Sequence, residues 1–256
     1  MMRCSLWVLG LLGVLVVLAA GCRHVVAEKP ASAHASWRVT APGMEVTQFR
    51  WRASAEEAAV LVAARIDPAR CEIRVLDARQ GSASNGNWAE MLCPRQGAVI
   101  NGSFFGDDHQ PIGLLVADGQ VLQRDVFRQD YATFQLRRRT PEIVSSSGTI
   151  ARGVTEAIEC KPRLVVAGEI PHFKAQGMRS RAAIGIDGQG RVIITATGNP
   201  LSLEEWAHCL REQFGCVNAL NLDGGPSAQL TVHGKVNASV SGGSAVPIFL
   251  LFAPKR

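Results

Sequence analysis

Short apolar segments separated by turn residues recur along the chain from residue 37 onward, and they predict a protein built mainly of strands. Residues 71–76 alternate between apolar and polar positions, which is typical of a strand with one buried face. Residues 60–66 form an apolar run that ends at the turn Asp67-Pro68. We therefore expect one strand on each side of this turn.

Two pairs of apolar runs are joined by turns that contain an Asp-Gly dipeptide, which predicts two β-hairpins. The first joins residues 112–116 to residues 121–122 through Asp118-Gly119. The second joins residues 183–186 to residues 192–197 through Asp187-Gly188. Further apolar runs predict strands at residues 98–100, 164–166, 217–222, 230–232 and 247–252.

The clearest helix is predicted over residues 202–214. Ser202 is suited to cap its first turn, where Glu204 and Glu205 lie at the end of the helix dipole that favours acids. Apolar side chains recur on one face at helical spacing, and Gly215 follows the last of them. Together the elements predict an α+β (mixed α/β) fold, a single domain over residues 37–256 of mixed, largely antiparallel sheets with a few packed helices.

The first residues have the layout of an export signal. Arg3 precedes an apolar segment over residues 6–18, which ends in Ala19-Ala20-Gly21-Cys22 and is too short for a membrane span. This ending resembles a bacterial lipobox, which implies a signal peptide over residues 1–21 and a lipid anchor on Cys22. A simple cleavage site followed by a cysteine is the alternative. Residues 22–36 predict a flexible tether, and Arg23 favours a periplasmic protein held at the outer membrane.

The charge balance argues against one class of partner. The 256 residues include 27 Lys and Arg against 22 Asp and Glu, which gives a net charge of +5 and a pI of about 9.0. The basic residues are scattered, and a single Tyr leaves little for base stacking, so no nucleic-acid partner is expected. The positive balance favours an anionic substrate or envelope polymer.

The cysteines bear on disulfide pairing, because export would place the chain in an oxidising compartment. Five remain beyond the signal and Cys22, and this odd number leaves at least one thiol free or intermolecular. Cys209 and Cys216 flank a helix end, where either a short disulfide or two buried free thiols would be consistent with the sequence. The other three are Cys71, Cys93 and Cys160. No Cys or His set has the spacing of metal ligands, so no metal site is predicted.

The most informative motif follows the apolar run of residues 217–222. That run ends at Asp223-Gly224-Gly225, and Ser227 comes two residues later. The glycines remove two Cβ atoms, so the backbone can take a positive φ and a ligand can approach it closely. The carboxylate would meet that ligand, and the N–H groups of the turn would bind an anion. A plain β-hairpin turn is the alternative.

Two other segments place reactive groups beside a predicted strand. Asn101-Gly102-Ser103 follows a short apolar run and offers an amide, a bare backbone and a hydroxyl, although an ordinary turn would have the same sequence. Arg181 precedes the apolar residues 183–186. Its guanidinium group either grips a phosphate through two hydrogen bonds or lies solvated on the surface.

Five segments, in order, resemble the phosphodiester glycosidase family, which includes the lysosomal uncovering enzyme and many bacterial envelope proteins. They are residues 99–105, 111–114, 162–166, 181–187 and 220–225. The resemblance implies the family's fold and a hydrolase that removes a sugar, N-acetylglucosamine in the lysosomal case, from a phosphodiester. The chain departs from many members at Ser103 and Pro226, where Gly is common, at Ala182, where Thr is common, and at Ala228, where Ser is common.

The reaction implied by this family passes through an oxocarbenium-like state, which needs a carboxylate near the anomeric carbon and donors around the phosphate. Asp223 is the candidate carboxylate, and Asn101 is the second candidate catalytic residue. The candidate substrate-binding residues are Gly102, Ser103, Arg181, Gly224, Gly225 and Ser227. Arg181 and the glycine turn are expected to hold the phosphate, while Asn101 and Ser103 orient sugar hydroxyls or the phosphate. No cofactor is required.

Other readings remain beside this one. Asp187 or Glu205 would supply a second carboxylate, but a hairpin turn and a helix start explain these two acids more simply. A serine hydrolase using Ser227 is rejected, because the surrounding residues do not form a Gly-x-Ser-x-Gly elbow. The expected function is an exported hydrolase that cleaves sugar phosphodiesters in envelope glycans. The alternative is a non-catalytic protein that binds envelope glycans or exopolysaccharide with the same fold.

Overall fold

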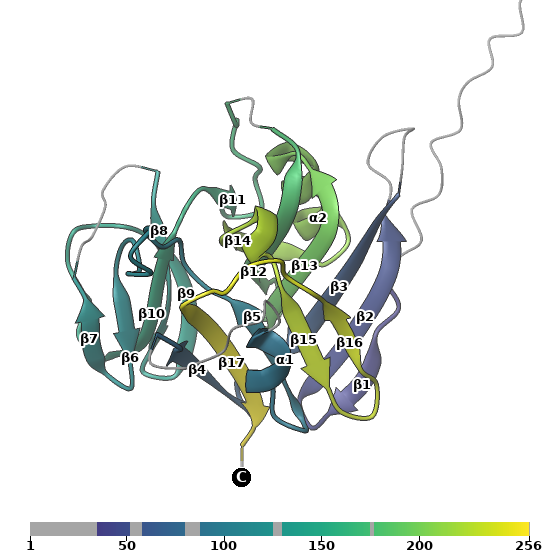
Figure 1. Ribbon diagram of the computed structural model, residues 1–256, viewed down its shortest axis with the longest axis horizontal. Helices are drawn as coiled ribbons and strands as arrows, with labels where there is room; N and C mark the ends of the chain where they lie inside the picture. The colour runs from purple at the N-terminus through teal and green to yellow at the C-terminus, as the bar shows by residue number, and fades with distance from the viewer. Residues whose placement is uncertain (1–34, 52–57, 80–87, 125–129, 175–176, 256) are drawn as a thin grey trace, which may run out of the picture. The chain divides into compact units, whose positions relative to one another are not determined.

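The computed structural model describes residues 35–51, 58–79, 88–124, 130–174 and 177–255 (Figure 1). The chain divides into two units, Met1–Ala31 and Ser32–Arg256, and all described residues belong to the second. The predicted signal peptide and Cys22 lie outside the described residues, as does nearly all of the predicted tether.

The largest sheet has seven strands in the order β1-β2-β3-β13-β12-β14-β11. Each strand is antiparallel to its neighbours. The bounds, in chain order, are β1 (Arg38–Ala41), β2 (Met44–Trp51), β3 (Ala59–Ile66), β11 (Arg163–Val165), β12 (Arg179–Asp187), β13 (Val192–Leu201) and β14 (Cys216–Asn221).

Two five-stranded sheets, also antiparallel, complete the described fold. One has the order β16-β15-β5-β17-β4. Its strands are β4 (Cys71–Asp77), β5 (Gly97–Asn101), β15 (Leu230–His233), β16 (Ala238–Val240) and β17 (Ile248–Pro254). The other has the order β7-β6-β10-β8-β9. Its strands are β6 (Leu115–Ala117), β7 (Gln120–Gln123), β8 (Ala132–Arg137), β9 (Thr140–Ser145) and β10 (Val154–Cys160).

The prediction of largely antiparallel sheets is confirmed, but the mixed α+β class is only partly right, because the fold is largely β. Within the described ranges the helical elements are α1 (Trp88–Leu92), α2 (Leu203–Glu212) and the 3-10 turn η1 (Gly225–Ser227). The physical reason is the length of the apolar runs. Most are too short for a helix that could bury a face, and they satisfy their backbone groups by pairing with other strands.

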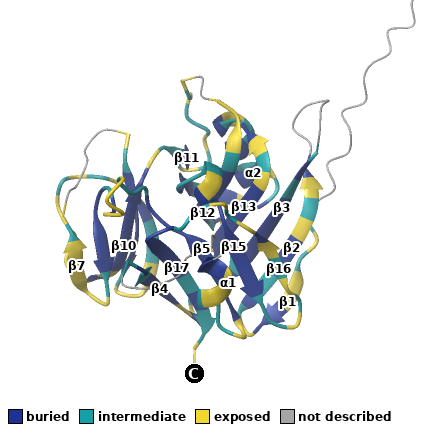
Figure 2. Ribbon diagram, viewed as in Figure 1, coloured by how far each residue is buried: buried dark blue, intermediate teal, exposed yellow. Residues whose placement is uncertain are grey.

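The three sheets share one hydrophobic core, to which Ile184 of β12, Ile100 of β5 and Phe134 of β8 contribute fully buried side chains (Figure 2). In β4 the alternation predicted from the sequence is present, since Cys71, Ile73 and Val75 are buried while the residues between them are exposed. The core thus lies between the sheets.

Helix α2 covers the opposite face of the seven-stranded sheet, where Trp206 and Leu210 belong to a second core cluster. The predicted Ser202 cap is present, and it is part of a capping box, because Glu205 N donates to Ser202 Oγ (3.1 Å) and Ser202 N donates to Glu205 Oε2 (2.9 Å). The predicted helix is therefore confirmed, although it ends at Glu212 rather than at residue 214. The Glu205 carboxylate therefore forms part of this helix cap.

Both predicted hairpins are confirmed, as β6 pairs with β7 and β12 pairs with β13. In the second hairpin, Asp187 Oδ1 accepts from the N–H groups of Gln189 and Arg191, each at 2.9 Å. Asp187 Oδ2 pairs with Arg191 Nε at 2.7 Å. The carboxylate of Asp187 therefore stabilises the turn of this hairpin.

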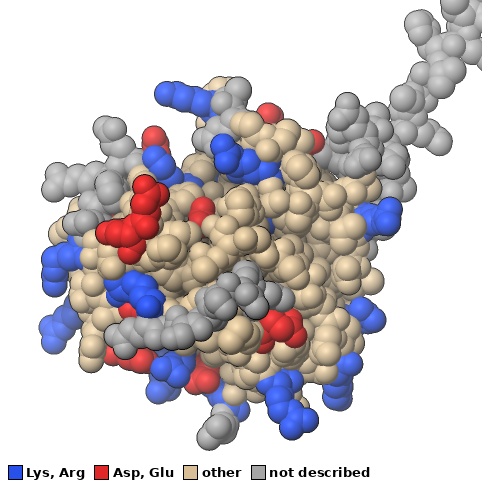
Figure 3. Space-filling model, viewed as in Figure 1, with Lys and Arg blue, Asp and Glu red and all other residues tan. Residues whose placement is uncertain are grey.

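All five cysteines in the described ranges are free thiols, so the disulfide considered for Cys209 and Cys216 is absent and the alternative of buried free thiols holds. Burial raises the pKa of both thiols above the ordinary value. None of the described helices is long and apolar enough to cross a membrane. On the face shown in Figure 3, basic side chains alternate with acidic ones instead of forming one continuous stripe.

Candidate active site

A cleft of about 630 Å³ opens where β14 ends and its two neighbours begin. Asn221 at the end of β14 and Asp223 just after it line the cleft, together with Arg181 from β12 and Arg163 from β11. Because β14 is antiparallel to β11 and β12, its carboxyl end meets the amino ends of both neighbours. The topology thus gathers segments that are far apart in the sequence.

Asp223 is held by backbone hydrogen bonds from two sheets. Leu222 N donates to Ala182 O on β12 (2.9 Å), and Asp223 N donates to Gly102 O, just after β5 (3.2 Å). Leu222 itself is fully buried in the shared core. The apolar residues of β14 therefore anchor the strand and place the next carboxylate in the cleft.

The Asp223 carboxyl group is half-buried and lies among hydrogen-bond donors. Burial raises its pKa, while hydrogen bonds from the Ser227 side chain and from Gly224 N partly oppose that rise. The Gly224 N–H lies 3.0 Å from Asp223 Oδ1. A carboxyl group with a raised pKa in a cleft is typical of functional sites.

The segment after Asp223 crosses from one sheet to another. Strand β14 belongs to the seven-stranded sheet, whereas β15 pairs with β5 and β16. The plain-hairpin alternative is therefore wrong, since β14 and β15 do not pair. A Cβ atom on Gly224 would lie 2.8 Å from Ser180 O, and Gly225 has a φ of +60°, so both glycines are required by the backbone here.

Asn101 lies behind Asp223 and outside the lining of the cleft. Its Nδ2 donates to Asp223 O (2.8 Å), and its Oδ1 accepts from Gln229 N (3.0 Å). The side chain is fully buried. Both ends of the amide are thus used to fix the crossing segment, which makes Asn101 a positioning residue.

The other predicted site residues divide between the cleft and its supports. Gly224 lines the cleft, whereas Gly102, Ser103, Gly225 and Ser227 do not. Gly102 N donates to Ile248 O (2.8 Å), and a Cβ atom there would meet the Ile248 side chain at 2.8 Å. Ser103 Oγ is buried and has no hydrogen-bond partner among the described residues. Gly225 and Ser227 belong to η1 in the crossing segment itself, whereas Gly102 lies beside that segment and accepts from Asp223 N.

Arg181 is the most deeply buried cation in the cleft, at 4% relative exposure. Its Nε donates to Leu201 O (2.9 Å) and its Nη2 donates to Gly177 O (3.0 Å). Burial, together with nearby Arg179, lowers its pKa. Within the described ranges no carboxylate forms an ion pair with Arg181, so its charge is available to an incoming anion.

Positive charge dominates the lining as a whole. Among the described residues, the acidic ones that line the cleft are Asp130 and Asp223. The Lys and Arg residues that line it are Lys161, Arg163, Lys174, Arg179 and Arg181. This balance favours a negatively charged ligand. Within the described ranges, no group of three His, Cys, Asp or Glu side chains could hold a metal ion.

Residues 95–253, which contain both the Asn101 turn and Asp223, match the phosphodiester glycosidase family. The chain belongs to this family. The resemblance found in the sequence is therefore confirmed. The match runs from just before β5 into β17, so it includes β14 and β15 on either side of Asp223 but not β1 to β4.

Solved structures of low identity share the fold of this phosphodiester glycosidase domain. The catalytic domain of zebrafish N-acetylglucosamine-1-phosphodiester α-N-acetylglucosaminidase is 18% identical, with a TM-score of 0.64 and 87% of each chain covered. A Synechocystis protein of unassigned function has 18% identity and a TM-score of 0.57, with 82% of this chain and 62% of that chain covered. A Burkholderia pseudomallei protein described as exported has 13% identity and a TM-score of 0.55, with 79% and 76% covered. No curated protein sequence matches.

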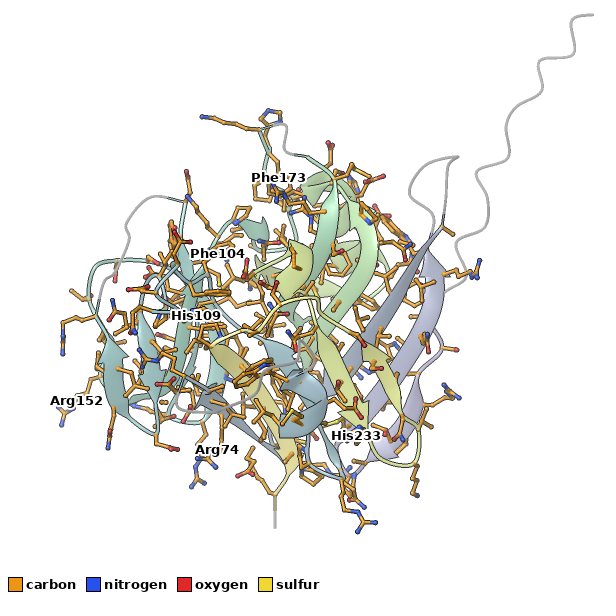
Figure 4. The ribbon with its side chains drawn as sticks, in the orientation of Figure 1. Arg74, Phe104, His109, Arg152, Phe173 and His233 are labelled. Carbon is orange, nitrogen blue, oxygen red and sulfur yellow. The ribbon has the colours of Figure 1, made fainter. Side chains whose placement is uncertain are left out.

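Several cleft residues of this phosphodiester glycosidase domain were not singled out from the sequence. Asn221 lies two residues before Asp223, and its Nδ2 donates to Lys161 O (3.0 Å) while its buried Oδ1 has no partner among the described residues. Phe104 and Phe173, labelled in Figure 4, line the cleft from two different connections. The spacing of Asn221 and Asp223 was an available signal, since alternate strand residues face the same side.

Proposed function

We propose that the chain hydrolyses the glycosidic C–O bond of sugar 1-phosphodiesters in envelope glycans or glycoconjugates. The observation that carries the proposal is that one cleft holds both a half-buried carboxyl group and a buried guanidinium group that has no acidic partner among the described residues. Asp223 and Arg181 come from adjacent strands, so their positions are fixed by backbone pairing. Membership of the phosphodiester glycosidase family supports the same reaction class.

The phosphate would bind on the β12 side of the cleft. Arg181 is held by two backbone carbonyls, so its guanidinium group is oriented before the substrate arrives. A phosphate oxygen would replace the missing acidic partner and form a charge-assisted hydrogen bond. Preorganised donors of this kind stabilise charge that develops on a leaving phosphate.

Asp223 would act at the anomeric carbon. As the bond from this carbon to the phosphate oxygen breaks, both electrons go to the phosphate and positive charge develops on the sugar. The ionised carboxylate stabilises that charge, and water adds its hydroxyl to the anomeric carbon while its remaining proton passes to the solvent. The products are a free sugar and a phosphomonoester.

Purified protein should cleave N-acetylglucosamine 1-phosphate methyl ester. On the acidic side of the pH profile, kcat/KM should fall at a pH higher than about 4, which is the ordinary pKa of an Asp carboxyl group. The sign follows from the raised pKa of Asp223. The carboxylate is the active form, so activity falls as the pH drops through that raised value. Phosphate-ester products followed from pH 3 to pH 9 provide the measurement. Activity that keeps rising toward pH 3 would contradict this role for Asp223.

The same assay separates the enzyme from the alternative of a glycan-binding protein. A binding protein would bind the intact phosphodiester, as measured by calorimetry, and would release no sugar at any pH. An inactive protein that binds the intact diester would therefore favour the binding function over the hydrolase.

We also propose that the protein is periplasmic and lipid-anchored through Cys22. The proposal rests on the run of small residues that closes the short apolar segment before this cysteine. Cys22→Ser should remove the acyl chains and leave the signal peptide uncut by the lipoprotein peptidase. Mass spectrometry of the mature N-terminus and fractionation of membranes provide the measurement. Wild-type protein that is free of lipid and cut at another site would exclude the anchor.

A further inference from the structure

The arginines of the described ranges differ in how their charge is neutralised. Seven of them are buried or half-buried, and five of these have a carboxylate oxygen within 4.0 Å. These five are Arg65, Arg79, Arg137, Arg191 and Arg211. The other two, Arg163 and Arg181, both line the cleft and have no such partner among the described residues. Removing a charge from water without an opposite charge nearby is costly, so a bound anion would stabilise the buried Arg181 and, to a lesser degree, the half-buried Arg163.

The two unpaired guanidinium groups lie on opposite sides of β14. In the sheet order, β14 separates β12, which carries Arg181, from β11, which carries Arg163. Arg163 donates from Nη2 to Asn218 Oδ1 (2.6 Å) and from Nη1 to Ser145 Oγ (3.4 Å). Both partners are neutral, and burial lowers the pKa of Arg163.

The contact with Asn218 sets the distance between Arg163 and the reacting centre. Asn218 lies in β14 and precedes Asp223, which follows the end of that strand, by five residues; this corresponds to at most roughly 16 Å of extended chain. Because its guanidinium group contacts Asn218, Arg163 lies on the order of 10 Å or more from Asp223. This distance is too long for Arg163 to share the phosphate bound by Arg181. It corresponds to about one sugar ring beyond the scissile phosphate.

Lys161 adds a second cation at this end of the cleft. It precedes Arg163 by two residues, and its Nζ lies 4.7 Å from the centre of the Tyr131 ring. Tyr131 also lines the cleft. A cation above an aromatic ring and a guanidinium group beside it together form a surface suited to an acidic sugar.

We propose that Arg163 and Lys161 form a second anion-binding subsite, which takes a phosphate or carboxylate carried by the sugar beyond the scissile phosphodiester. The inference rests on the proposed function, and it narrows the substrate class. The preferred substrate is an acidic glycan in which the residue after the phosphodiester bears its own negative charge. A diphosphate, whose second charge lies directly beside the first, would not span the distance.

Three matched substrates test the subsite. N-acetylglucosamine 1-phosphate is esterified to O4 of methyl glucoside, of methyl glucoside 6-phosphate or of methyl glucuronide, so the aglycone is neutral, phosphorylated or carboxylated. Wild-type protein should show a KM about tenfold lower for the charged aglycones than for the neutral one, because one charge-assisted contact is added. The preference should shrink in 0.5 M salt. Comparing the two charged substrates identifies which anion the subsite takes.

The variant Arg163→Gln should bring the three KM values to within about twofold of one another. Arg74→Gln is the matched control, because Arg74 is exposed, pairs with Asp118 and lies outside the cleft; it should keep the wild-type preference. Arg163→Lys keeps the charge and should keep part of the preference for charged aglycones. This second variant tests the subsite if Arg163→Gln proves too unstable to assay. Equal KM values in wild type, or a preference that Arg163→Gln leaves intact, would overturn the subsite.

Failure of the proposed function gives a different pattern. If none of the three compounds is hydrolysed, calorimetry measures their affinities for the intact protein. Tighter binding of the charged compounds that depends on Arg163 would then support the subsite without catalysis. Equal affinities would reject the subsite, whether or not the protein is an enzyme.

Discussion

Asp223→Asn should lower kcat/KM by roughly 100-fold or more while the protein melts at the wild-type temperature or above it. The amide keeps an acceptor for Gly224 N but removes the charge that stabilises the developing oxocarbenium ion. Burial raises the pKa of Asp223. Its ionised form therefore costs folding free energy, and stability is lost as the pH rises through the folded pKa. Melting temperature and sugar release are measured at pH 7 on the same preparation.

Asp187→Asn is the matched control for this result, because it changes the same chemical group at a structural site. The Asp187 carboxylate accepts two turn N–H groups and the Arg191 side chain. Its loss should destabilise the protein by about 1.5–3 kcal/mol with activity per folded molecule retained. A stable and fully active Asp223→Asn protein would remove Asp223 from the mechanism.

Arg181→Lys should lower kcat/KM by roughly 10- to 100-fold on the neutral substrate, mostly through KM. Lysine keeps the charge but loses the planar fork. It cannot reproduce both backbone contacts of Arg181, to Leu201 O and Gly177 O, and still face a phosphate. Initial rates over a range of substrate concentrations separate KM from kcat.

Arg179→Lys gives the comparison within the same strand. Arg179 is exposed and also lines the cleft, so a smaller change of about two- to threefold is expected from its replacement. If Arg181→Lys were as active as wild type, Arg181 would have no part in binding the phosphate. If both variants lost activity equally, the general positive potential of the cleft would explain the effect better than a specific contact.

The parts of the fold that depend on neighbouring residues were predictable from the sequence. The hairpin at Asp187 and the cap formed by Ser202 and Glu205 use side chains within a few residues of the groups that they bind. The hydrophobic alternation of β4 likewise follows from its own sequence. Such local chemistry leaves a readable pattern.

The path of the chain after β14 was not predictable in the same way. An Asp-Gly-Gly turn between two apolar runs has the chemistry of a hairpin, but here β14 and β15 enter different sheets. The choice depends on which distant strand pairs with β15, and that strand is β5, more than a hundred residues earlier. The alternation of apolar and polar residues in a strand does not indicate which distant strand it pairs with.

The same limit applies to the candidate site. Asp223, Arg181 and Gly224 were expected in the site and lie in the cleft. Asn101 was expected to contact substrate, but its amide is used behind the cleft. Arg163 became a candidate only when the sheet order placed it across β14 from Arg181. The strands that lie on either side of β14 are determined by the topology of the sheet and cannot be read from the sequence of β14 alone.

The hydrogen bonds of Asn101 also determine when during synthesis the site can exist. They join Asn101 to residues 122 and 128 positions later in the chain, and β5 finds its partners only in β15 and β17. Contacts of such long sequence separation form late and slowly. A nascent chain that ends before Gln229 cannot complete these hydrogen bonds, so the segment that carries Asp223 is fixed in place only after the chain has been made as far as Gln229.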